Sequence, residues 1–274
     1  MEKMYCYVGD VLGFSDMVSE LTLDEEKNLT PDDITRFTPE ERAKRVDSWT
    51  KLVEREIDKH DISHYQFVSD TIFVGVEPNN DGLERLIKFS KDMLNNGIEN
   101  SLPLRAGIAY GDVEWREKIS FGTALINAHK LEEEQNWIGT CCESDLPGIE
   151  NMWDFEKVFC YPAPLKTERL LTYRPVISWN VPKYRDLRNK TSVNAIRHKY
   201  VTWRYDSLIQ NTILFSMYKN LIVNNVLETA KPSSFGGYLM EILEFYIDDI
   251  CHEKYLQDKG LKKQFIFSRD HTTI

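Results

Sequence analysis

Short apolar runs alternate along this chain with longer segments of helical spacing. Residues 4–10 form an apolar run rich in aromatic and β-branched side chains, which is typical of a buried strand. Gly13 follows this run, so the pattern predicts a strand, a tight turn and the start of a helix. Residues 64–76 alternate in polarity, and they predict two strands that are joined at Ser69 and Asp70.

Further elements follow the same two periodicities. Helical spacing predicts a helix that Thr38 caps and Pro39 opens, a second over residues 82–96, and a third within SFGTALINAHKLEEEQ. Strands are expected in LPLRAGIAYGDVEW, WIGTCC, EKVFCYP and RPVISWNV. Strands and helices interspersed in this way predict an α+β or α/β fold.

The composition changes after Pro182 and becomes helical and rich in Tyr and Leu. Residues 205–230 and 235–258 are expected to form two helices, with KPSSFGG between them. The chain is therefore interpreted as one domain over residues 1–182, with a helical excursion at about 20–60, and a C-terminal helical extension over residues 183–274. The extension is expected either to pack on the sheet as a helical hairpin or to join protomers.

Charge and composition exclude several classes of function. The formal net charge of −10 argues against non-specific nucleic-acid binding, which needs a basic surface. The most apolar long stretch, residues 208–226, contains polar residues that predict a buried or interfacial helix rather than a membrane span. The first residues lack the pattern of a signal peptide, and the five cysteines show no C-x-x-C spacing. We therefore expect a cytoplasmic protein with reduced thiols.

Two carboxylates stand at the ends of apolar strands. Asp10 ends YCYVGD and Asp70 ends HYQFVSD. Burying two carboxylates close together is unfavourable unless a cation neutralises them. If the two strands are neighbours, this pair predicts a divalent metal site that would take a phosphate ligand.

Four segments in order resemble the class III nucleotidyl cyclases, over roughly residues 4–180. YVGDVLGFSD is similar to the family's first metal motif, and YQFVSDTIFVGV is similar to its second metal hairpin. LRAGIAYGDVEW resembles the strand that usually contains R-x-G-I-x-x-G, and FGTALINAHKLEEEQNWIG resembles the helix that carries transition-state residues. The resemblance implies a ferredoxin-like α+β catalytic domain with a mixed, mostly antiparallel sheet.

The resemblance also implies roles for individual residues. Two divalent cations, Mn²⁺ or Mg²⁺, would be held by Asp10, Asp70 and the carbonyl of Val11. Lys130 would stabilise charge on the α-phosphate, and Asn127 would contact the nucleotide. Phosphate contacts would come from the backbone of Gly13, Phe14 and Ser15 at a helix start, with Lys166 as a further candidate.

Several positions depart from the family pattern. Ile126 occupies the position of the usual Asn, Lys130 that of the usual Arg, and Ile119 that of the Asp that recognises adenine. Gln66 replaces the Lys that recognises adenine, and strand alternation places it on the same face as Asp70. With Arg116, Gln66 could reach the edge of a smaller base.

The combination of cyclase metal ligands, an altered base pocket and the sequence KLEEEQNWIG is most similar to the bacterial Pycsar pyrimidine cyclases. That resemblance implies conversion of UTP or CTP to a cyclic nucleotide, with UTP slightly preferred, as an antiviral signal for a separate effector protein. It also implies a homodimer in which each active site is shared between protomers. Two alternatives stay open: an adenylyl or guanylyl cyclase, or a cyclase-like module that binds nucleotide without catalysis.

Overall fold

The computed structural model describes most of the chain, namely residues 1–14, 39–116, 120–166, 173–183, 185–187, 190 and 202–223. Ser15, which was expected to contact the substrate, lies outside these ranges. Ile119, which occupies the position of the family's adenine-recognising Asp, also lies outside them. The expected cap Thr38 and the expected helix over residues 235–258 also lie outside them.

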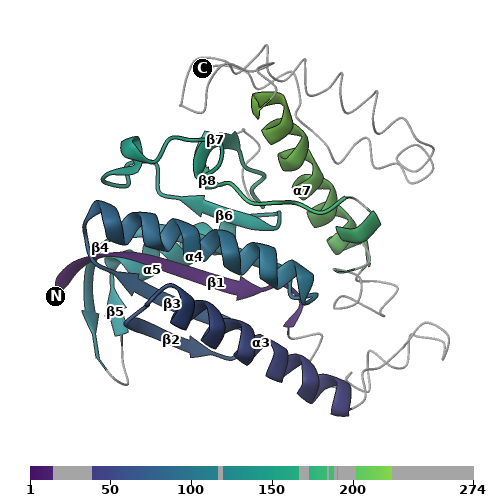
Figure 1. Ribbon diagram of the computed structural model, residues 1–274, viewed down its shortest axis with the longest axis horizontal. Helices are drawn as coiled ribbons and strands as arrows, with labels where there is room; N and C mark the ends of the chain where they lie inside the picture. Colours follow the sequence, from purple (N-terminus) through teal and green to yellow (C-terminus); the bar gives the residue numbers. More distant parts are fainter. Residues whose placement is uncertain are drawn as a thin grey trace.

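One eight-stranded sheet forms the centre of the molecule (Figure 1). Its strands are β1 (Glu2–Val11), β2 (His64–Val68), β3 (Thr71–Val76), β4 (Leu104–Trp115), β5 (Ser120–Gly122), β6 (Gly139–Cys142), β7 (Val158–Pro162) and β8 (Tyr173–Ile177). The spatial order is β2-β3-β1-β4-β6-β8-β7, and β5 pairs with β4. Only β4 and β6 pair in parallel among the described strands. The predicted α+β class with a mostly antiparallel sheet is confirmed.

Helices cover both faces of the sheet. The helices are α3 (Pro39–Lys59), α4 (Asn80–Glu99), α5 (Thr123–Glu134) and α7 (Thr202–Val223), with a short 3₁₀ helix η2 (Ile149–Asn151). Figure 1 shows α3 and α4 in front of the sheet, and the core clusters place α5 on the opposite face. None of the described helices is long and apolar enough to cross a membrane.

Both faces of β1 are apolar, which explains its continuous hydrophobic run. Tyr5 and Tyr7 pack in the core beneath α3 and α4. Met4, Cys6 and Val8 alternate with them and pack in the smaller core beneath α5. A strand buried on both faces cannot show polar alternation, so its sequence is apolar throughout.

The two strands β2 and β3 form the predicted hairpin, with Ser69 and Asp70 as its turn. Ser69 has a φ of 60°, in the left-handed region that tight hairpin turns require. The indole Nε1 of Trp49, on α3, donates a hydrogen bond to the carbonyl oxygen of Ser69 at 3.0 Å. This contact fixes the turn to the buried side of α3.

The first predicted C-terminal helix packs against the far end of the sheet, where α7 shares the main core. Phe215 is fully buried, and its ring lies 4.9 Å from that of Trp137 and 5.4 Å from that of Phe159. The backbone N–H of Ile138 donates to the hydroxyl of Thr212 at 2.9 Å. The part of the extension that the structure describes is therefore attached to the sheet, and the domain division at residue 182 stays a prediction.

Candidate active site

Asp10 and Asp70 are brought together by the pairing of β1 with β3. Asp10 lies opposite Thr71 in this pairing, and Asp70 immediately precedes Thr71. The hydroxyl of Thr71 donates to Oδ1 of Asp10 at 3.1 Å. The backbone N–H of Val11 donates to the carbonyl oxygen of Asp70 at 3.3 Å. Two segments that are distant in the sequence thus place their carboxylates at the same end of two neighbouring strands, β1 and β3.

The electrostatic environment of Asp10 disfavours its ionised form. Burial raises the pKa of Asp10 to about 7, and the nearby carboxylates of Asp70 and Glu132 contribute to the rise. The hydrogen bond from Thr71 and the charge of Arg105 lower the pKa of Asp10, but they do not offset the rise. A metal cation close to Asp10 would reverse the balance by stabilising the carboxylate.

The donor atoms at these strand ends fit a hard divalent cation. Carboxylate oxygens are the ligands that Mg²⁺ and Mn²⁺ prefer. Arg105 is the cationic side chain that lowers the pKa of Asp10, and it already forms an ion pair with Glu132. Asp10 and Asp70 could therefore hold such a cation, and the buried Val11 directly follows Asp10 in the chain.

A buried network fixes α5 on β4 beside Asp10. The Nε of Arg105 donates to Oε1 of Glu132 at 2.6 Å, and its Nη1 donates to the carbonyl oxygen of Gln135 at 3.1 Å. The amide of Gln135 donates to the carbonyl oxygen of Ala106 at 2.6 Å. A Cβ at Gly107 would collide with the backbone of α5, so glycine permits this close approach.

The expected phosphate-binding turn follows β1 directly. Gly13 adopts a φ of 78°, in the left-handed region where glycine carries no steric cost. Phe14 is 5% exposed and belongs to the main core, which anchors the turn. Gly13 lies three residues after Asp10, and the role of the turn in phosphate binding stays a prediction.

Two of the expected base-recognition residues lie together. The amide nitrogen of Gln66 donates to the carbonyl oxygen of Arg116 at 3.0 Å, and the guanidinium of Arg116 pairs with Glu114 at 2.9 Å. Strand pairing places Gln66 opposite Phe73, which packs against the core beneath α5. Gln66 therefore faces the same side of the sheet as Asp10.

The remaining expected residues lie on or beside α5. Lys130 is exposed, and so is Lys166, whose backbone N–H donates to the carbonyl oxygen of Glu134 at 2.7 Å. Asn127 is half-buried, and its side-chain amide donates to Oε1 of Glu143 at 3.0 Å. Asn127 is thus oriented by Glu143, whereas Lys130 points away from the buried side of the helix.

Three contributors to this site are not evident from motifs. Thr71 binds Asp10, Trp49 holds the hairpin turn, and Glu132 contributes to the charge around Asp10. Helical periodicity could have selected Glu132 within the run of three glutamates, because it follows the buried Ala128 by four residues. The other two depend on contacts between distant segments.

Comparisons with known proteins give structural matches only. No protein-family model matches the chain, and no curated protein matches it significantly. A bacterial light-regulated adenylyl cyclase is 13% identical, covers 70% of this chain and 98% of its own, and has a TM-score of 0.44. The adenylyl cyclase CyaB from P. aeruginosa is 12% identical, covers 66% and 96%, and has a TM-score of 0.40. The guanylate cyclase domain of RhGC from Catenaria anguillulae, in complex with GTP, is 12% identical, covers 65% and 97%, and has a TM-score of 0.43.

The raised pKa of Asp10 predicts how pH affects stability without divalent cations. In the unfolded chain this carboxyl titrates near 3.8, whereas in the folded protein its pKa is about 7. Between these values folding takes up a proton, so the contribution of Asp10 to stability falls as pH rises through 7. In EDTA, the effect of Asp10→Asn on the free energy of unfolding should be more stabilising at pH 8 than at pH 5, by on the order of 2 kcal/mol. Urea denaturation at both pH values measures this, and an equal effect of the substitution at both would contradict it.

The hydrogen bond from Trp49 predicts a local effect on the hairpin turn. Trp49→Phe keeps an aromatic ring in the core but removes the donor to Ser69, which should lower the free energy of unfolding by about 1 kcal/mol. Hydrogen exchange at the Val11 amide, which donates to Asp70, should become faster. Ser48→Ala is the matched control, because Ser48 neighbours Trp49 on α3, and its hydroxyl donates within that helix to the carbonyl oxygen of Lys44. Equal exchange rates in both variants would argue against a role for Trp49 in holding the turn.

Proposed function

We propose that this protein is a nucleotidyl cyclase of class III type that converts a pyrimidine nucleoside triphosphate, UTP in preference to CTP, to the 3′,5′-cyclic nucleotide. The observation that carries this proposal is the convergence of Asp10 and Asp70 at the same end of β1 and β3, within four motifs in the order of that family. The product would serve as a signal for a separate effector in antiviral defence, which rests on the resemblance alone.

The reaction needs few protein groups. The ribose 3′-oxygen attacks the α-phosphorus, the bond between the α-phosphorus and the bridging oxygen breaks, and pyrophosphate leaves while the hydroxyl proton passes to water. Two Mn²⁺ or Mg²⁺ ions, when bound, would make the hydroxyl more acidic and neutralise the triphosphate. Asp10, Asp70 and the Val11 carbonyl would hold the ions, and the turn at Gly13, Phe14 and Ser15 would hold the phosphates.

The choice of a pyrimidine is supported by the residues near Asp10 on the α5 face. Gln66 offers an amide with both donor and acceptor atoms, at the position where adenylyl cyclases carry the Lys that recognises adenine. Its hydrogen bond to the Arg116 carbonyl fixes the amide in one orientation on that face. Arg116 and Asn127 would complete the contacts to the nucleotide, and Lys166 would reach its terminal phosphates.

A homodimer is supported by exposed apolar side chains on the edge strand β2, on β5 and on α5. The edge strand β2 exposes Tyr65, Phe67 and Val68 by 39–68%, and Phe121 and Ile126 are also about half exposed. Exposed apolar edge strands favour association with another chain. Lys130, exposed on α5, would then act in the site of the partner, and each protomer would supply part of both active sites.

The first test of this proposal identifies the product. Incubation with each of the four nucleoside triphosphates and Mn²⁺, followed by mass analysis, should give cyclic UMP as the main product and cyclic CMP as a minor one. Asp10→Asn should lower the rate at least about 100-fold, because the carboxylate that holds the ions is lost. Asp112→Asn, at an exposed position of β4, is the matched control and should keep its activity. A cyclic purine as the sole product would reject the pyrimidine assignment, and no product from any nucleotide would favour a binding module.

The shared site predicts complementation between inactive chains. Asp70→Ala and Lys130→Ala should each abolish activity alone, because each homodimer then lacks one group in both sites. A mixture should regain about a quarter of the activity, since half of the dimers are mixed and one of their two sites is intact. Product formation and size-exclusion chromatography measure rescue and dimer content. Mixed dimers without activity would overturn the shared-site arrangement.

A further inference from the structure

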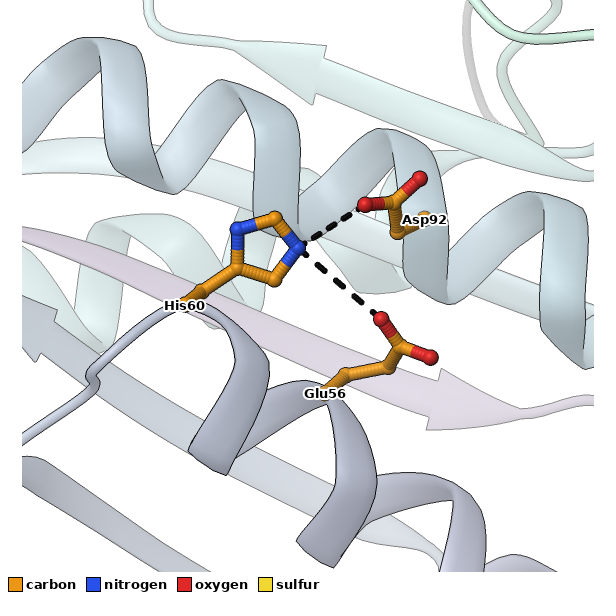
Figure 2. Close-up of side chains that lie close together, drawn as sticks. All are labelled: Glu56, His60 and Asp92. Carbon is orange, nitrogen blue, oxygen red and sulfur yellow. Dashed lines mark hydrogen bonds and ion pairs between the residues drawn. The ribbon is translucent and has the colours of Figure 1, made fainter.

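A second cluster of ligand-type side chains lies between α3 and α4, on the opposite face of the sheet from α5 (Figures 1 and 2). Nε2 of His60 lies 2.9 Å from Oδ2 of Asp92 and 3.8 Å from Oε2 of Glu56. One ligand atom from each of the three residues lies within 4.8 Å of the others. Glu56 lies in the last turn of α3 and His60 directly follows the helix, four residues on, so both side chains face α4.

One carboxylate oxygen in this cluster is buried without a hydrogen bond. Glu56 is 0% exposed, and its Oε1 accepts hydrogen bonds from Arg55 at 2.8 Å and Asn96 at 2.9 Å. Its Oε2 has no hydrogen-bond partner among the described residues, and it is directed at His60 (Figure 2). An unsatisfied buried carboxylate oxygen destabilises the folded protein, and a bound cation would satisfy it.

A cationic side chain already approaches the cluster from the solvent. Nζ of Lys59 lies 2.8 Å from Oδ2 of Asp92 and 3.6 Å from Oε2 of Glu56. The side chain of Lys59 is 51% exposed, so it can withdraw into water without unpacking the core. The position between the two carboxylates therefore attracts positive charge and can be reached from outside.

We propose that Glu56, His60 and Asp92 bind a transition-metal cation of the Zn²⁺ type, which links α3 to α4. One imidazole nitrogen and two carboxylate oxygens suit Zn²⁺, whereas Mg²⁺ prefers oxygen ligands alone. Three protein ligands leave the fourth tetrahedral position to water, at the place that Lys59 vacates. The cation would fix the C-terminal end of α3, the helix whose Trp49 holds the turn of Asp70.

The test separates this site from the carboxylates of the proposed active site. Full-length Asp10→Asn/Asp70→Asn protein, titrated with Zn²⁺ by calorimetry, should retain the site, and His60→Ala in the same background should lose one Zn²⁺ per chain. At a free Zn²⁺ concentration about 100 times the Kd, the melting temperature should rise by roughly 5–10 °C, and His60→Ala should remove this rise. Mg²⁺ at the same concentration should produce no such shift.

Three further variants check the geometry. Asp92→Asn changes the side chain little in size, and it should weaken Zn²⁺ binding even if His60→Ala proves unstable. Lys59→Met removes the competing ammonium group and should tighten Zn²⁺ binding by up to about fivefold. Lys51→Met is the matched control, because Lys51 pairs with Asp47 on the same helix, and it should leave the affinity unchanged. Zn²⁺ binding that is insensitive to His60 and Asp92, or that Lys59→Met weakens, would overturn the proposal, and so would the absence of binding.

Discussion

The carboxylates of Asp10 and Asp70, held together where the paired strands β1 and β3 meet the hairpin turn, are the constraint on which the remainder of this structure depends. Asp10 is placed there by the pairing of β1 with β3, and the same pairing places Asp70 next to Thr71. Burial and like charge together raise the pKa of Asp10 to about 7, so the folded chain concentrates negative potential at one point. Stability alone would favour a neutral side chain here, and an arrangement this unfavourable is typical of a functional site.

The surrounding elements support these strand ends from both faces of the sheet. On one face, Trp49 of α3 binds the carbonyl of Ser69 and fixes the hairpin turn. On the other, Arg105 and Glu132 form a buried ion pair that holds α5 against β4. Removing either partner of that pair would leave an uncompensated charge next to Asp10. The site therefore depends on packing that is distant from any residue expected to touch the substrate.

Much of this fold could be predicted from sequence periodicity. The apolar run before Asp10 and the alternation before Asp70 predicted β1 and the β2–β3 hairpin, and helical spacing predicted α4 and α5. These signals are local, so one sequence suffices to find them. The short strand β5 was missed, because three residues carry too little periodic signal.

Contacts between distant segments could not be predicted in the same way. The hydrogen bond between Gln66 and the Arg116 carbonyl depends on how the end of β4 approaches β2. The pairing of Asn127 with Glu143 depends on where the chain after β6 passes α5. Glu56 and His60 did carry a signal, since they continue the buried stripe of Trp49, Leu52 and Val53 along α3 as polar residues. Their partner Asp92 lies on another helix and could be identified only from the structure.

The two-residue turn of the β2–β3 hairpin couples two features that could otherwise vary independently. Because side chains alternate between the faces of a strand, a one-residue shift in the pairing of β2 with β3 would move Gln66 to the opposite face while Asp70 stayed at the tip. The register that this turn sets therefore decides whether residue 66 and the carboxylates share one face of the sheet. A substitution at position 66 changes only the side chain that is presented there.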